Sequence, residues 1–197
     1  ITSFINHSKF GLVNFLLLPF SAIFFIFSYI RLCLYKVRLL KVSVSSVPVI
    51  VIGNITAGGT GKTPIVIAVA NYFASRNKMV GVVSRGYGGK YPQESLEVTS
   101  KSDPIDCGDE PLLIKQQTEA FVVVAKKRSN AVKFLTENYS VDLIISDDGL
   151  QHYAMGRNIE IAVIDGHNRL GNGLFLPAGP LRETKKRLKS VDFIINN

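Results

Sequence analysis

Residues 47–64 read VPVIVIGNITAGGTGKTP, an apolar run followed by a glycine-rich loop and then by Gly-Lys-Thr. A strand, a loop of this composition and a helix that starts at Lys-Thr form the arrangement of a phosphate-binding P-loop. Its glycines let backbone N–H groups surround phosphate oxygens, and the start of the helix adds a positive dipole. The predicted phosphate-binding residues are Thr56, Ala57, Gly58, Gly59, Thr60, Gly61, Lys62 and Thr63.

Within this loop, Lys62 is expected to reach the β- and γ-phosphates of a nucleotide, and the Thr63 hydroxyl to bind Mg²⁺. One position departs from the usual G-x-x-x-x-G-K-[ST] pattern, since Thr56 stands where the first glycine is expected and Gly53 lies upstream. The alternative is a glycine-rich turn without a ligand. Gly-Lys-Thr directly after a strand makes that alternative the weaker one.

The rest of the chain alternates apolar, strand-like runs with helix-like segments, which predicts βαβ units. The fold class is therefore α/β, a P-loop NTPase-like, mostly parallel sheet flanked by helices. In such sheets ligands bind beyond the carboxyl ends of the strands. We predict strands at 47–52, 79–84, 121–125, 141–146, 159–164 and 191–195, and helices at 62–76, 110–119 and 129–139.

Acidic residues follow two of these strands. Leu143 to Ser146 is an apolar strand that ends in Asp147 and Asp148, as expected of carboxylates that hold Mg²⁺ beside a P-loop. Only one of the pair is needed as a metal ligand. Asp165 also follows a strand, and it is as well explained as an ordinary turn residue before Gly166.

The segment from Cys107 to Pro111 opens a predicted helix with two acidic residues, Asp109 and Glu110. Acidic side chains in a first helical turn are ordinarily structural. If the segment faces the γ-phosphate instead, Asp109 could accept a proton from a hydroxyl and Glu110 could join the metal ligands. The spacing leaves both interpretations open.

The N-terminal residues 10–30 contain no charged residue and are about as long as a helix that crosses a bilayer. A signal peptide, a buried helix and an interfacial helix kinked at Pro19 are the alternatives. Basic residues follow the apolar run at Arg31, Lys36, Arg38 and Lys41, which places the remainder in the cytoplasm. We therefore expect a membrane anchor with a basic juxtamembrane segment at 1–42, and a P-loop kinase domain at 43–197.

The formal net charge of +8 is spread along the chain and forms no basic stripe of the kind that binds nucleic acid. An anionic membrane surface or a phosphorylated substrate fits this charge better. The two cysteines provide no disulfide framework. Because the sequence begins at Ile1 and stops just after a strand, we expect a fragment at both ends. The oligomeric state is not predicted.

Five motifs occur in the order TAGGTGKT (56–63), VSRGYGG (83–89), GDEPLLI (108–114), ISDDGLQHY (145–153) and LPAGPLRE (176–183). Together with the apolar N-terminal run, they resemble the tetraacyldisaccharide 4'-kinase family from about residue 10 to the end. The resemblance implies transfer of the γ-phosphoryl group of ATP, with Mg²⁺, to the 4'-hydroxyl of a tetraacylated glucosamine disaccharide 1-phosphate. That reaction belongs to lipid A biosynthesis at the cytoplasmic face of the bacterial inner membrane.

The resemblance also implies roles for individual residues. Asp109 corresponds to the catalytic carboxylate, and Lys62 and Arg182 act with it, with Arg85 a further arginine near substrate or phosphates. The family's second, smaller C-terminal domain, which carries a histidine that pairs with the catalytic Asp, is expected to lie outside this chain. The residues expected around nucleotide and metal are Gln151 for the nucleotide, and Thr63, Glu110, Asp147 and Asp148 for Mg²⁺.

Two other functions remain open. A membrane-associated GTPase switch is the main rival enzyme, although the Asn-Lys-x-Asp-like motif that usually reads guanine is missing from this sequence. The other is a truncated product that binds nucleotide without catalysis.

Overall fold

The computed structural model describes residues 11–91 and 94–197, so the part of the predicted membrane anchor before residue 11 lies outside the described residues. The chain divides into two compact units. Unit 1 contains the described part of Ile1–Lys41 together with Asn54–Gly61 and Ile161–Asn197, and unit 2 contains Val42–Gly53 and Lys62–Glu160.

Unit 2 is built around a mostly parallel sheet with the strand order β3-β4-β2-β5-β1. Neighbours from β4 to β1 run parallel, and only the short β3 is antiparallel to β4. Every residue of β1, β2 and β5 is buried, as expected of strands covered on both faces. The strands are β1 (Val49–Gly53), β2 (Val80–Ser84), β3 (Leu96–Val98), β4 (Phe121–Val124) and β5 (Leu143–Asp147).

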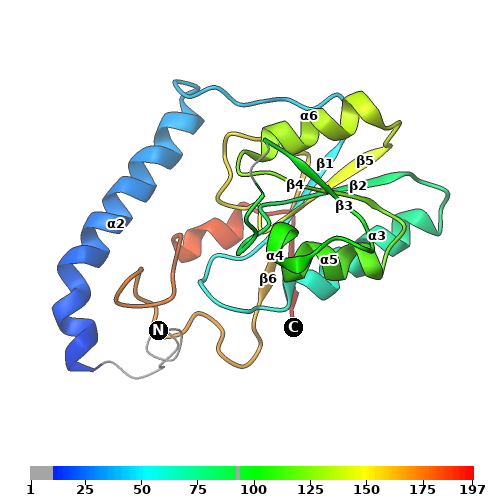
Figure 1. Ribbon diagram of the computed structural model, residues 1–197. Helices are drawn as coiled ribbons and strands as arrows, with labels where there is room; N and C mark the ends of the chain where they lie inside the picture. The colour runs from blue at the N-terminus through cyan, green and yellow to red at the C-terminus, as the bar shows by residue number, and fades with distance from the viewer. Residues whose placement is uncertain (1–10, 92–93) are drawn as a thin grey trace. The chain divides into compact units, whose positions relative to one another are not determined.

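Helices cover both faces of this sheet (Figure 1). One face carries α6, and the opposite face carries α3 and α5, which pack against each other. Because β1 leads through residues 54–61 into α3, the predicted P-loop begins at the carboxyl end of a fully buried strand. The helices are α3 (Lys62–Ala74), α4 (Pro104–Cys107), α5 (Asp109–Gln116) and α6 (Arg128–Asn138).

Unit 1 contains the long helix α2 (Leu12–Lys36) and a parallel pair of strands. These are β6 (Ile159–Ile164), which begins two residues before the unit does, and β7 (Phe193–Asn196). The 3-10 helix η1 (Lys185–Lys189) precedes β7. Among the described residues, α2 is the one helix long and apolar enough to cross a membrane, a test that some signal sequences and core helices also pass.

The structure confirms the α/β fold class and a strand at each of the six predicted positions, with ends that differ by at most two residues. Three elements were not predicted: β3, α4 and η1. Each is only three to five residues long, and β3 is a partly exposed edge strand with the polar residue Glu97 at its centre. Helix α2 also continues beyond the apolar run to Lys36, because Arg31 and Lys36 are good helix formers.

Candidate nucleotide-binding site

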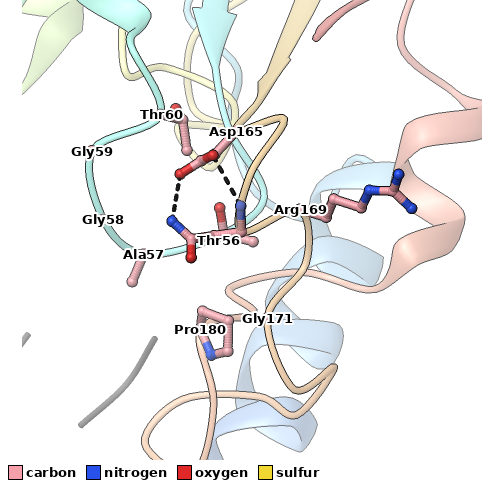
Figure 2. Close-up of a pocket in the computed structure, with 10 residues that line it drawn as sticks. Thr56, Ala57, Gly58, Gly59, Thr60, Asp165, Arg169, Gly171 and Pro180 are labelled. Carbon is pink, nitrogen blue, oxygen red and sulfur yellow. Dashed lines mark hydrogen bonds between the residues drawn. The ribbon is translucent and has the colours of Figure 1, made fainter. Parts of the chain in front are cut away.

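In unit 1, the loop Asn54–Gly61 borders an open hollow (Figure 2). Residues 56–60 form one side, and Asp165, Arg169 and Pro180 are among those that complete it. Gly58 and Gly61 adopt positive φ values of 119° and 70°, which favour glycine. Gly58 and Gly59 are exposed at the hollow, so their backbone is accessible to a ligand.

The start of the loop is held by residues 180–182 of the same unit. The Ala57 amide donates to the Pro180 carbonyl at 2.7 Å, and the Arg182 amide donates to the Ile55 carbonyl at 2.8 Å. Between these bonds, Thr56 forms an antiparallel bridge with Leu181. A bridge of this kind needs no glycine, which accounts for threonine at the position where the P-loop pattern has its first glycine. The bridge does not involve the backbone amides after Ala57, so these amides can donate to phosphate oxygens.

Asp165 behaves as a turn residue. Its Oδ1 accepts hydrogen bonds from the amides of His167 at 2.8 Å and Asn168 at 3.0 Å, and its Oδ2 accepts one from Asn168 Nδ2 at 2.8 Å. These bonds lower the pKa of the carboxyl group, the Asn168 amide most of all. Figure 2 shows the Arg169 side chain pointing away from the loop 56–60. Asp165 is therefore explained without a ligand.

Unit 2 begins its part of the P-loop motif at Lys62, the first residue of α3. The Lys62 Nζ lies 3.6 Å from Asp148 Oδ1, and only 10% of the Lys62 side chain is exposed. Thr63, in the same first turn, is half-buried. Asp148 adopts a positive φ of 47°, which aspartate tolerates better than most residues. The second aspartate after β5 is therefore the ion-pair partner of the P-loop lysine.

Asp147, the last residue of β5, is in a different environment. It is 1% exposed, and its Oδ2 accepts a hydrogen bond from Ser84 Oγ at 3.2 Å. Its Oδ1 has no hydrogen-bond partner among the described residues. Burial, with the charges of Glu110 and Asp148, raises the pKa of Asp147 to about 6, against the opposing effect of Lys62 and Arg128. A buried carboxylate oxygen without a partner is the kind of donor that Mg²⁺ prefers.

Arg128, at the start of α6, holds the turn that carries both aspartates. Its Nη2 donates to the carbonyls of Asp147 at 2.8 Å and Asp148 at 2.9 Å, and the residue is 5% exposed. Burial lowers the pKa of the guanidinium, while the two carboxylates oppose that shift. Sequence reasoning missed this residue. It stands in the basic run Lys126-Lys127-Arg128, where nothing distinguishes it from a surface charge.

Asp109 and Glu110 occupy the exposed first turn of α5, as predicted, and the N-cap is Gly108. Gly108 has a φ of 88°, and a Cβ atom there would lie 2.8 Å from the Tyr87 carbonyl oxygen. The turn therefore packs closely against the glycine-rich segment after β2. Glu110 is close enough to Asp147 for its charge to raise the pKa of that residue.

The predicted acidic metal ligands Glu110, Asp147 and Asp148 do not come together as one metal-binding group. Within residues 11–91 and 94–197, no three His, Cys, Asp or Glu side chains are placed so that they could hold a metal ion. Of the other predicted site residues, Gln151 lies half-buried in the turn after β5 of unit 2. Arg182 is half-buried in unit 1, beside the start of the loop.

Comparison with known proteins gives consistent results. The family described as LpxK, tetraacyldisaccharide-1-P 4'-kinase, matches residues 13–197. The tetraacyldisaccharide 4'-kinase of Ruthia magnifica subsp. Calyptogena magnifica is 59% identical over 95% of this chain and 59% of its own length. The corresponding protein of Coxiella burnetii (strain RSA 331 / Henzerling II) is 50% identical over 94% of this chain and 57% of its length.

Among solved structures, the "apo" form of LpxK from Aquifex aeolicus, in complex with ATP, matches with a TM-score of 0.84 and 32% identity. The match covers 94% of this chain and 59% of that one. The chain thus spans less than two thirds of the length of the relatives that it matches.

Proposed function

The chain belongs to the tetraacyldisaccharide-1-P 4'-kinase family, and we propose that the protein transfers the γ-phosphoryl group of ATP to the 4'-hydroxyl of a tetraacylated disaccharide 1-phosphate. This step phosphorylates a lipid A precursor. The observation that carries the proposal is the P-loop motif, in which the glycine-rich loop lines a hollow and Lys62 begins the next helix. The identity of the acceptor is inferred from the family membership.

In this proposal, the exposed amides of Gly58 and Gly59 and those that follow bind phosphate oxygens. Lys62 is consecutive with Gly61 in the chain and reaches the same phosphates. Its charge stabilises the negative charge on the oxygens of the migrating phosphoryl group. Asp148 keeps the lysine ordered at 3.6 Å before nucleotide binds. A side chain fixed in advance loses less conformational entropy when the substrate arrives.

We propose Asp147 and Thr63 as the protein ligands of Mg²⁺. A magnesium ion commonly takes one or two protein oxygens and completes its ligands with water and phosphates, so a cluster of three acidic residues is not required. Asp147 fits because its Oδ1 is buried and unpartnered among the described residues, whereas Asp148 already pairs with Lys62. When bound, the ion neutralises charge on the β- and γ-phosphates. Glu110 is proposed as an acidic residue near the ion that is not one of its two direct protein ligands.

Asp109 is the proposed base for the acceptor. It is exposed in the first turn of α5, so a lipid hydroxyl can reach it. By accepting the proton of the 4'-hydroxyl as the bond to phosphorus forms, its carboxylate raises the nucleophilicity of that oxygen. Arg182, Arg85 and Gln151 remain predicted contacts to phosphate, substrate or nucleotide.

The proposed reaction can be tested by incubating the full-length protein with γ-labelled ATP and a tetraacyldisaccharide 1-phosphate. We expect label in the lipid fraction, with mass spectrometry showing one added phosphate at the 4'-position. Nucleotide hydrolysis at the same rate with and without lipid, and faster with GTP than with ATP, would favour the GTPase switch. Tight ATP binding without transfer would favour a protein that only binds nucleotide.

We further propose that the protein associates with the cytoplasmic face of the inner membrane through α2. Large apolar side chains are exposed along this helix, among them Phe20 at 60% and Phe27 at 70%. Asn14 and Ser21 instead donate hydrogen bonds to the backbone of unit 1, at Ala178 and Phe175. A helix with one protein-facing and one apolar exposed face suits a position in the membrane interface better than one surrounded by lipid.

Replacing Phe20 and Phe27 together by glutamate is expected to abolish most flotation of the full-length protein with anionic liposomes, because two charges enter the lipid-facing side. Tyr72→Glu is the control, since Tyr72 is a 52% exposed aromatic residue on α3. Flotation of the double variant as complete as that of the parent would show that this face of α2 does not bind the membrane.

A further inference from the structure

Helix α2 has one buried residue, Ser21, which is 5% exposed. Asn14 lies seven residues before it and Phe25 four residues after it, so the three side chains share one face of the helix. A serine in the middle of an apolar helix needs a partner for its hydroxyl. The partner is a single segment of unit 1, residues 174–182, referred to here as the 174–182 segment.

Three side chains of α2 attach to this segment. Ser21 Oγ donates to the Phe175 carbonyl at 2.8 Å and accepts from the Ala178 amide at 2.9 Å. Asn14 Nδ2 donates to the Ala178 carbonyl at 2.7 Å. The Phe25 and Phe175 rings pack with their centroids 4.8 Å apart. One serine thus satisfies two backbone groups three residues apart.

The 174–182 segment holds its own shape. The Leu176 amide donates to the Leu181 carbonyl at 3.0 Å, and the Leu181 amide donates to the Leu174 carbonyl at 2.9 Å. Gly179 is enclosed so closely that a Cβ atom there would lie 2.1 Å from Asn172 Oδ1. Ala178 and Leu181 are almost completely buried. A displacement at Ala178 is therefore passed on along the segment.

The other end of the segment holds the P-loop. The Pro180 carbonyl, two residues after Ala178, accepts a hydrogen bond from the Ala57 amide at 2.7 Å. The Arg182 amide donates one to the Ile55 carbonyl at 2.8 Å. Thr56 bridges Leu181 between these bonds. Ser21 is thus linked to the beginning of the phosphate-binding loop through one short, internally bonded stretch of backbone.

We infer that Ser21 is a positioning residue for ATP binding: from within the apolar helix it fixes the 174–182 segment, which fixes Thr56 and Ala57 at the start of the P-loop. The inference rests on the proposed function, because it takes this loop as the ATP site. It gives α2 a second role beside membrane association. Loss of the Ser21 hydroxyl leaves the buried Ala178 amide without its acceptor, a cost that is relieved by movement of the segment.

The test compares ATP binding by three variants of the full-length protein in detergent, measured by isothermal titration calorimetry. We expect Ser21→Ala to raise the Kd for ATP, and the KM for ATP, by about tenfold, since one lost buried hydrogen bond is the underlying change. Ser21→Thr keeps the hydroxyl and is expected to retain most of the affinity. Ser28→Ala is the matched control, because Ser28 lies on the same helix without a side-chain hydrogen bond within the described residues.

A Kd for ATP that is the same in Ser21→Ala and Ser28→Ala would overturn the inference. A lower kcat for Ser21→Ala at unchanged KM and Kd for ATP would also overturn it, because that result indicates only a smaller amount of folded enzyme. If Ser21→Ala fails to fold, the Kd for ATP of Asn14→Leu is the test. It should rise by about twofold because the hydrogen bond to Ala178 is lost, and it should not change if the inference is wrong. A parent protein that binds no ATP would refute the proposed function instead.

Discussion

Replacing Lys62 by alanine is expected to lower the kcat of the full-length protein in the proposed transfer reaction by at least about a thousandfold, the scale of effect seen when a charge that stabilises a migrating phosphoryl group is removed. The Lys62 side chain is 10% exposed, so little water is present to take over its role. The measurement is the steady-state rate of labelled phosphate transfer to the lipid at saturating ATP.

The matched control is Lys78→Ala in the same unit. Lys78 also pairs with an aspartate, with its Nζ 3.4 Å from Asp142 Oδ1, but its side chain is 52% exposed. An exposed pair of this kind contributes little, so activity is expected to stay within about twofold of the parent. A Lys62→Ala variant that turns over as fast as Lys78→Ala would show that the P-loop lysine has no part in catalysis.

The strands and the loop were predictable because their signals are local. The run Val49–Gly53 is continuously apolar, as a doubly covered parallel strand must be, and the glycines that follow provide the backbone freedom that a P-loop needs. β3 was missed because three residues at a sheet edge, including the charged Glu97, carry no such pattern. Its place is decided by pairing with β4, a contact that the local sequence does not encode.

The division of roles between the two aspartates after β5 was not predictable either. Asp147 and Asp148 are neighbours in sequence, yet one ends a buried strand and the other turns outward with a φ of 47° toward Lys62. Arg128, nineteen residues before Asp147, bonds to the carbonyls of both. Such differences arise from tertiary packing, which is also why nothing in the sequence distinguishes Ser21 within its apolar helix.

Asp109→Asn is expected to lower kcat by about a hundredfold to a thousandfold with little change in the Kd for ATP, as is typical when a general base is lost. Asp109 lies exposed in the first turn of α5 and is not one of the two protein ligands proposed for Mg²⁺. Added Mg²⁺ should therefore not restore the rate. Asp106→Asn, an exposed acidic residue in the first turn of α4, is the control and should retain normal turnover.

Asp147→Asn is expected to behave differently, because it removes the buried, unpartnered oxygen proposed to bind Mg²⁺. The Mg²⁺ concentration needed for half-maximal rate should rise at least about tenfold, and excess Mg²⁺ should recover part of kcat. Asp148→Asn, which leaves Lys62 without its acidic partner, should change the KM for ATP more than the Mg²⁺ requirement. Rescue of Asp109→Asn by Mg²⁺, with no rescue of Asp147→Asn, would reverse these assignments.

The pH dependence of the Mg²⁺ requirement separates the two aspartates further. The pKa of Asp147 is raised to about 6, so its carboxylate takes up a proton as the pH falls through that value. Mg²⁺ binds the ionised form, so the parent protein should need more Mg²⁺ at pH 5.5 than at pH 7.5, by about fourfold for a single group of this pKa. Asparagine at position 147 does not titrate, so this dependence should disappear in Asp147→Asn and persist in Asp148→Asn. A dependence that is lost only in Asp148→Asn would make that residue the metal ligand.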